Sequence, residues 1–193
     1  MVRTKEFDPD AALDAALDLF WERGYEATSI QDLVDHLGIG RGSLYATFGS
    51  KHELYLKALD RYLRSRDPDP IELLNRPGPA LPAVRTLVRA YADEAARDAR
   101  RRGCMIVNAA MERVPADALV TRRVQASWRA LERALAAALT RAREQGELAE
   151  DKDPAAIARF LLVVLQGLRV VGKAGPDPAR LRDAAELALS VLD

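Results

Sequence analysis

Residues 28–53, TSIQDLVDHLGIGRGSLYATFGSKHE, predict two short helices, a tight turn between them and the start of a third helix. Thr28 stands three residues before Gln31, a spacing that predicts a capping box at the start of the first helix. Gly38 follows the last apolar position, where a left-handed residue commonly ends a helix. The apolar residues between them recur at i, i+3, i+4 and i+7 and form one helix face: Ile30, Leu33, Val34 and Leu37.

The second helix is expected over residues 41–48, with Leu44 and Phe48 buried and a nearly charge-free face outward. Ser50 and Glu53 predict a second capping box, for a longer helix that follows. Two helices joined by a short glycine turn form the helix-turn-helix unit, whose second helix can enter the DNA major groove. The alternative is a helical hairpin that only packs. The coincidence of two capping boxes, a tight turn and this outward face favours contact with DNA.

The outward side chains of the second helix suit duplex DNA. Arg41 can bind guanine through two hydrogen bonds or pair with a phosphate, and Thr47 offers a hydroxyl and a methyl group. Tyr45 brings a phenol within reach of phosphate. Lys51 stands in the first turn of the next helix, beside backbone amides that favour an anion. These four residues are therefore candidate DNA contacts.

The segment GIGRGSLYATFGSKHELYLKAL, preceded by ALDLFWERGYEATSIQDLVDHL, resembles the DNA-binding domain of the TetR family of transcriptional regulators, over roughly residues 8–66. The resemblance implies a homodimeric, all-helical, ligand-controlled DNA-binding protein, most often a repressor. The chain departs from the family at Gly40, where a Ser or Thr that caps the helix and touches phosphate is more usual. The expected DNA-binding residues are Thr28, Arg41, Gly42, Ser43, Tyr45, Thr47 and Lys51.

Composition supports a mostly helical chain. Of the 193 residues 49% are hydrophobic, alanine and leucine dominate, and aromatic residues are only 6%, so an all-α fold is expected. Lysine and arginine together number 29, as do aspartate and glutamate. A zero net charge argues against a protein that coats nucleic acid, whereas a site-specific binder needs only a local basic surface. Basic residues outnumber acidic ones from Arg41 to Arg66.

Proline placement predicts the domain organisation. Residues 1–66 form a three-helix helix-turn-helix DNA-binding domain, in which a helix that starts at Asp8-Pro9 packs across the other two. The proline-rich stretch at 67–80 breaks helix and connects the domains. Residues 81–193 form a helical effector-binding and dimerisation domain, for about nine helices in total.

The last two helices predict a homodimer. They start at Asp153-Pro154 and Asp177-Pro178, and the first has an apolar arc too wide for one contact. Two such helices per chain can form a four-helix bundle across a two-fold axis. The alternative is simple packing within one chain.

Candidate effector-binding residues are polar or aromatic side chains on otherwise apolar helices, because small-molecule sites are mostly apolar with few convergent polar groups. The alternative is that they serve the core, as methionines commonly do. Cys104 stands at a helix start after three arginines, a setting that favours a thiolate. It resembles the sensing cysteine of electrophile-responsive members of the family, although a lone buried cysteine is most often a small hydrophobe. The candidates are Tyr91, Cys104, Asn108, Met111, Trp128, Gln166 and Arg169.

Other classes of function find no support in the sequence. His36 and His52 lie inside the helix-turn-helix region without metal-ligand spacing, and no phosphate-cradling loop or nucleophile motif is present. We expect no enzyme, no metal and no cofactor. The N-terminus lacks an apolar signal core and no run approaches a membrane span, which predicts a cytoplasmic protein.

The sequence thus favours a regulator that represses from a palindromic operator and is released by a small-molecule effector. The alternatives are a helical small-molecule-binding or scaffold dimer without DNA binding, and a regulator that senses electrophiles or redox state through Cys104.

Overall fold

The computed structural model describes residues 7–66, 69–175 and 177–193. Every regular element in these ranges is helical, which confirms the all-α prediction. In chain order the elements are α1 (Pro9–Arg23), α2 (Ile30–Leu37), α3 (Arg41–Phe48), α4 (Lys51–Arg64), α5 (Pro70–Leu74), α6 (Ala80–Arg97), α7 (Met105–Arg113), α8 (Ala118–Glu144), α9 (Pro154–Ala174), α10 (Pro178–Leu189) and the final 3₁₀ turn η1 (Ser190–Leu192).

The helix α5 was not expected. It lies in the stretch from 67 to 80, where dense proline predicts a connection without helix. Pro70 occupies the first helical position, where a missing N–H costs nothing, and the Asp69 carboxylate accepts hydrogen bonds from the Ile71 and Glu72 amides. The prolines therefore start this helix rather than prevent it.

The chain divides into two compact units. The N-terminal unit combines the residues up to Ser65 with Asn108–Arg123, and the C-terminal unit combines Arg66–Val107 with Val124–Asp193. The first break follows Ser65. Residues 108–123, which the sequence alone places with the second domain, group with the N-terminal unit, so the division falls within α7 and again within α8.

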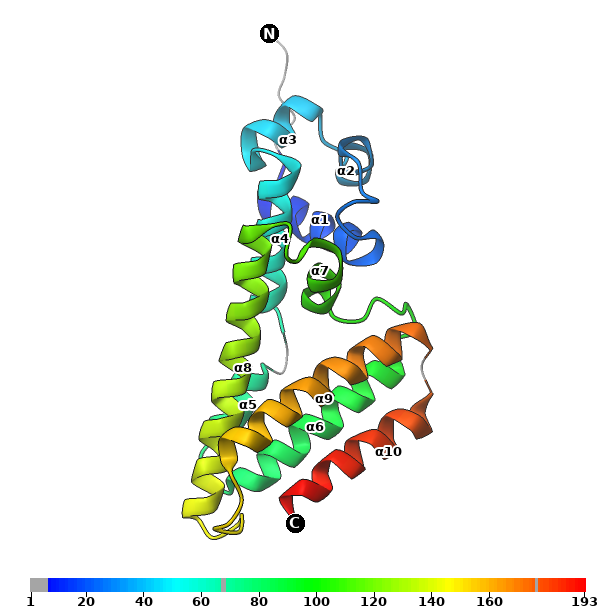
Figure 1. Ribbon diagram of the computed structural model, residues 1–193. Helices are drawn as coiled ribbons and strands as arrows, with labels where there is room; N and C mark the ends of the chain where they lie inside the picture. The colour runs from blue at the N-terminus through cyan, green and yellow to red at the C-terminus, as the bar shows by residue number, and fades with distance from the viewer. Residues whose placement is uncertain (1–6, 67–68, 176) are drawn as a thin grey trace. The chain divides into compact units, whose positions relative to one another are not determined.

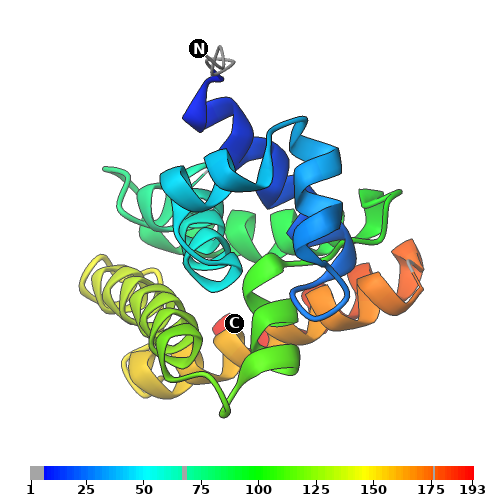
Figure 2. The same cartoon turned by 90° about the horizontal axis from the view of Figure 1, so that it is seen from above.

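The N-terminal unit is built around α1 to α4. Leu33, Leu44 and Leu54, one each from α2, α3 and α4, are fully buried. The Phe20 ring of α1 meets the Tyr55 ring of α4 edge-on at 5.1 Å between centroids. Figure 1 shows α1 lying across α4, and Figure 2 shows α2 and α3 following each other across the short turn. The expected three-helix arrangement, completed by α4, is what buries these side chains.

The two helix starts in this unit are capped, but one differs from expectation. Ser50 and Glu53 form the predicted capping box of α4. The capping box of α2 joins Ser29 and Asp32, so the prediction that Thr28 caps this helix is wrong. Thr28 is completely buried, and its hydroxyl donates to the Gly24 carbonyl at 2.6 Å, which turns it away from the helix start.

The C-terminal unit holds a second, larger core. Helices α6, α9 and α10 lie side by side (Figure 1). Their apolar faces, together with that of α8 from Leu131 onward, bury one continuous cluster; its completely buried members are Val84, Val88, Leu135, Ala138, Leu139, Ala142, Ala158, Leu161 and Leu165, together with Leu74 of α5.

One face of α9 is apolar and exposed. Val163 is 71% exposed, and Phe160, Val170 and Val171 are also exposed. By length and composition α9 is able to cross a membrane, so the expectation that no run approaches a span is wrong by that measure. A third of its most apolar window is buried, and core helices of soluble proteins pass the same test.

We predict very unequal losses of stability from neighbouring substitutions in α3. Leu44→Ala empties a fully buried site and should lower the free energy of unfolding by about 2–5 kcal/mol. Tyr45→Ala removes a side chain that is 45% exposed and should change it by no more than about 0.5 kcal/mol. Urea unfolding followed by circular dichroism measures both, and equal losses would contradict the assigned orientation of α3.

Candidate nucleic-acid interface

The helix α3 turns its predicted reading face outward. Arg41, Gly42 and Tyr45 are exposed, whereas Leu44 and Phe48 are buried beneath them. Ser43 and Thr47 are half-buried. The Arg41 guanidinium reaches only a long hydrogen bond, 3.4 Å, to the Gln31 amide oxygen. Five of the seven expected DNA-binding residues therefore lie along one short helix, with an arginine at its start.

The start of α3 has no side-chain cap. Its N-cap is Gly40, and no side chain accepts from the first amides of the helix. The weak cap expected from the sequence is confirmed. Those amide groups point out of the helix start, where the helix dipole favours an anion.

Thr28 does not belong to this exposed set. It is completely buried and hydrogen-bonded to Gly24, so its hydroxyl is not presented to solvent with the α3 side chains. We leave it out of the contacts proposed below.

Lys51 lies in the first turn of α4, half-buried, with its ammonium 4.2 Å from the centroid of the Tyr25 ring. The Ser50 hydroxyl and the Glu53 carboxylate satisfy the amides at this helix start. Hydrogen bonds that the Glu53 carboxylate accepts from Ser50, first from its backbone amide, lower the pKa of that carboxyl. The cation is therefore held beside a fixed helix end rather than left on a loose chain end.

Part of the basic surface expected between Arg41 and Arg66 is neutralised. Arg61 binds the Asp14 carboxylate with two hydrogen bonds of 2.7 and 2.8 Å, and this partner raises the pKa of the Arg61 guanidinium. Asp14 of α1 therefore neutralises a basic residue of α4. Arg41 and Lys51 keep their place in the candidate interface.

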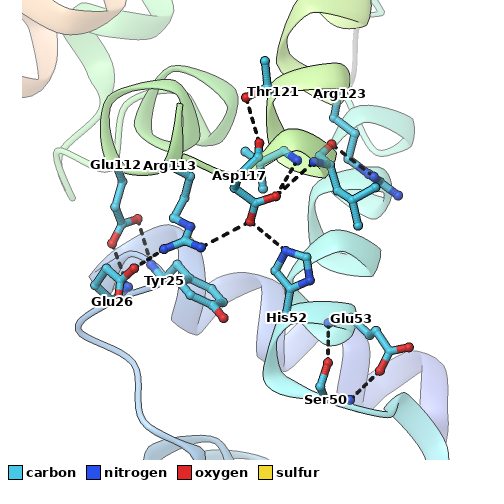
Figure 3. A network of polar contacts seen from close by, with 12 residues as sticks. Tyr25, Glu26, Ser50, His52, Glu53, Glu112, Arg113, Asp117, Thr121 and Arg123 are labelled. Atoms are coloured by element: carbon cyan, nitrogen blue, oxygen red, sulfur yellow. Dashed lines mark hydrogen bonds and ion pairs between the residues drawn. The ribbon is translucent and has the colours of Figure 1, made fainter. Parts of the chain in front are cut away.

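A polar corner at residues 112–117, where α7 ends and α8 begins, contacts the N-terminal helices, and no sequence pattern predicts it (Figure 3). Both Glu112 carboxylate oxygens accept backbone hydrogen bonds, from Tyr25 at 2.9 Å and from Glu26 at 2.7 Å. Arg113 pairs with the Glu26 carboxylate and with Asp117. All of these residues belong to the N-terminal unit.

Asp117 is buried in this corner, and its carboxylate binds several of the neighbouring groups. Its Oδ2 lies 2.7 Å from His52 Nε2, and its Oδ1 accepts the Leu119 and Val120 amides at the start of α8. Burial acts to raise the pKa of this carboxyl, but the hydrogen bonds from Val120, His52 and Arg113 outweigh it and bring the pKa to about 2. His52 of α4 thus binds a buried carboxylate.

The structure brings two of the predicted effector-binding residues together. Tyr91 is buried on α6, and the guanidinium carbon of Arg169 lies 4.2 Å from its ring centroid. The Tyr91 hydroxyl accepts a hydrogen bond from Arg66 at 2.8 Å. Arg169, only 5% exposed, also pairs with Glu94 at 2.9 Å.

The remaining predicted effector-binding residues are dispersed. Cys104 is buried, and Gln166 and Trp128 are half-buried in the C-terminal unit. The Trp128 indole nitrogen is buried and has no hydrogen-bond acceptor among the described residues. Asn108 and Met111 belong to the N-terminal unit. Met111 is 79% exposed.

A small apolar hollow lies elsewhere, between α9 and α10. Its volume is about 220 Å³, and none of the seven predicted effector-binding residues lines it. The lining residues are Val164, Gly167, Leu168, Val171, Arg180, Leu181 and Ala184. Within the described ranges of the chain, no group of three His, Cys, Asp or Glu side chains could hold a metal ion.

We expect the free energy of unfolding of Asp117→Asn to fall less than that of the wild type as the pH is lowered. Because the pKa of Asp117 falls from 3.8 to about 2 on folding, its contribution is complete above about pH 4 and disappears as the pH falls toward 2. At about 1.4 kcal/mol per pKa unit, that contribution is on the order of 2 kcal/mol. Denaturant unfolding at pH 7 and pH 3 measures it. If the free energy of unfolding of Asp117→Asn falls between pH 7 and pH 3 as much as that of the wild type, Asp117 does not make this contribution to stability.

Comparison with known proteins identifies the family. The family model of bacterial regulatory proteins, tetR family, matches residues 12–58, and that of the tetracyclin repressor-like C-terminal domain matches residues 80–188. The uncharacterized HTH-type transcriptional regulator YezE of Bacillus subtilis is 40% identical, with all of both chains covered. The HTH-type transcriptional repressor ComR of Escherichia coli is 31% identical over 97% of this chain and 90% of its own.

A solved structure agrees with these relatives. A cysteine mutant of the TetR family transcriptional regulator CifR, complexed with 26-bp double-strand operator DNA, aligns with a TM-score of 0.85 and 34% identity over 97% of this chain and 98% of its own. The helix-turn-helix geometry described above and the full-length match to YezE lead to the same conclusion. The chain belongs to the TetR family of bacterial transcriptional regulators.

Proposed function

We propose that this protein is a cytoplasmic transcriptional repressor that binds a palindromic operator as a homodimer and is released by a small-molecule effector. The observation that carries the proposal is the outward face of α3, with Arg41 and Tyr45 exposed over the buried Leu44 and Phe48. The complex of CifR with operator DNA, a protein 34% identical to this chain, supports DNA binding here. In a dimer the two α3 helices would enter the major groove about 34 Å apart.

The expected contacts divide by chemistry. Arg41 stands at the start of α3, where it can bind a guanine edge through two hydrogen bonds, and Thr47 and Ser43 offer hydroxyls farther along the same helix. Tyr45 and Lys51 suit phosphates, which position the protein but carry no sequence information. Gly42 leaves the first turn of α3 without a side chain beside Arg41, so the DNA backbone could approach closely there.

The exposed apolar face of α9 supports the homodimer. Val163 and Leu187 are each more than 70% exposed, on α9 and α10 respectively. A large exposed apolar patch usually marks an interaction surface. A second copy related by a two-fold axis would cover this face with its own α9 and α10, as a four-helix bundle.

The C-terminal unit offers polar groups for an effector within an apolar core. The stacked Tyr91 and Arg169, and the indole N–H of Trp128 that lacks an acceptor among the described residues, are the groups that favour effector binding there. We propose that an effector shifts α7 and that this shift alters the spacing of the two α3 helices. To move the dimer from mostly bound to mostly released, the effector must prefer the released state by roughly 5 kcal/mol.

Selection from a pool of random duplex DNA tests the proposed function. We expect the protein to enrich one near-palindromic sequence, with two half-sites about one helical turn apart. A pool that remains unenriched, despite a folded dimer, would favour the alternative of a helical scaffold or small-molecule-binding dimer that does not bind DNA.

Arg41→Ala and Lys51→Ala should lose DNA affinity in different ways. Arg41→Ala should cost about 1–3 kcal/mol and relax the base preference at one position of each half-site. Lys51→Ala should weaken all sequences alike and reduce the slope of log affinity against log salt by about 0.9 for each subunit. Fluorescence anisotropy on the selected duplex and on single-base variants distinguishes these results. A uniform loss for Arg41→Ala would reassign it to a phosphate.

Val163→Arg should dissociate the homodimer. It places a charge on the exposed face of α9, where burial against a second copy would leave it unpaired. Sedimentation equilibrium should report a single chain, and operator affinity should fall with it. Met111→Arg is the matched control, because Met111 is equally apolar and exposed but lies on α7. A dimer that persists in Val163→Arg would place the interface elsewhere.

A further inference from the structure

The ring of Tyr25 lies against two cations. The Lys51 ammonium lies 4.2 Å from the ring centroid, and the guanidinium carbon of Arg113 lies 4.5 Å from it. An ammonium group has three N–H donors, so one side can rest on the electron-rich ring while the remaining donors point toward an anion. The ring therefore orients the Lys51 ammonium group and leaves N–H donors of that group available to bind a phosphate.

The corner at residues 112–117 holds this ring in place. Glu112 accepts the backbone N–H groups of Tyr25 and Glu26, the two residues that follow Gly24 (Figure 3). A side-chain carbon at Gly24 would lie 3.0 Å from the Glu112 carboxylate, and the positive φ of 86° there also favours glycine. The close approach of Glu112 to this turn is therefore built into the backbone.

The same corner holds the start of the helix that carries Lys51. His52, the next residue, lies 2.7 Å from the buried Asp117 carboxylate. Arg113 would repel Lys51 across the shared ring, but it is paired with both Glu26 and Asp117. Both partners of the contact between Lys51 and Tyr25 are thus anchored to one short segment more than 60 residues away in sequence.

We propose that Glu112, Arg113 and Asp117 are positioning residues for DNA binding. They fix the Tyr25 ring and the start of α4, which together aim the Lys51 ammonium at a DNA phosphate. None of the three needs to touch DNA. The inference rests on the proposed function, because it requires that Lys51 binds a phosphate.

A double-mutant cycle between Tyr25 and Lys51 tests this inference. We expect Tyr25→Leu to weaken binding of the selected duplex about two- to fivefold, the range of a cation–π contact near a surface. In the Lys51→Ala background the same substitution should cause no further loss, because there is no ammonium left to orient. Tyr25→Phe keeps the ring and should bind as the wild type does.

A second cycle replaces Tyr25→Leu by Arg113→Met, which keeps the ring intact and removes the ion pairs of the corner. The loss of affinity should again vanish in the Lys51→Ala background. Arg123→Met is the matched control: it also removes an arginine of the same unit, one that pairs with Asp60, and should leave the affinity unchanged. This cycle stands in for the first if Tyr25→Leu unfolds, since the Tyr25 ring also packs against Phe20 and Tyr55.

Affinities are measured by anisotropy at several salt concentrations, well below the unfolding temperature of every variant. Coupling that disappears with Lys51, together with a reduced salt slope in Tyr25→Leu, supports the inference. If Tyr25→Leu and Arg113→Met lose as much affinity in the Lys51→Ala background as in the wild type, with the salt slope unchanged, these residues have a merely structural role. That result would overturn the inference but leave DNA binding by the protein intact. Lys51→Ala that binds as the wild type would overturn both the phosphate contact and the inference.

Discussion

Burial of Leu44 and Phe48 is the constraint on which the function of this protein depends. Both side chains are almost completely removed from solvent on the inner side of α3. An eight-residue helix has little stability of its own, so this contact with the N-terminal core decides both that α3 forms and how it is rotated. The rotation exposes Arg41 and Tyr45 together. A helix with the same sequence turned by half a revolution would present nothing that reads DNA.

The residues around α3 keep that rotation fixed. Capping boxes stabilise the starts of α2 and α4, the helices before and after it. The corner at residues 112–117 adds contacts from a distant part of the chain to the turn after α1 and to the start of α4. That corner joins α7 to α8, two helices whose remaining residues belong to the C-terminal unit.

The sequence predicted the helix-turn-helix well because its determinants are local. Glycines at helix ends, caps three residues from an acidic partner and apolar residues at helical spacing all lie within one short stretch. The competition between Thr28 and Ser29 for the N-cap could not be resolved this way. The outcome depends on whether the Thr28 side chain is buried against Gly24, which is a matter of packing. The helix α5 was missed because proline both starts and breaks helices.

The candidate site was only half predictable, since the rest depends on contacts between distant residues. The partners of Glu112, and the His52 partner of Asp117, lie 65 to 87 residues away, so no spacing reveals them. The contact between His52 and Asp117 could not be seen in the sequence for the same reason. The effector-binding residues were predicted only as polar or aromatic side chains on apolar helices, a criterion that does not say which of them lie together. Tyr91 and Arg169 meet because α6 and α9 pack together, and the others lie apart.

The central claim is that two copies of α3 read one duplex from the same side. Hydroxyl-radical footprinting of the DNA sequence selected by the protein measures this directly. Two α3 helices on one duplex should give two protected backbone regions of equal strength, related by a two-fold axis and separated by about one helical turn, roughly 34 Å. One protected region alone, or protection spread evenly along the duplex, would contradict it.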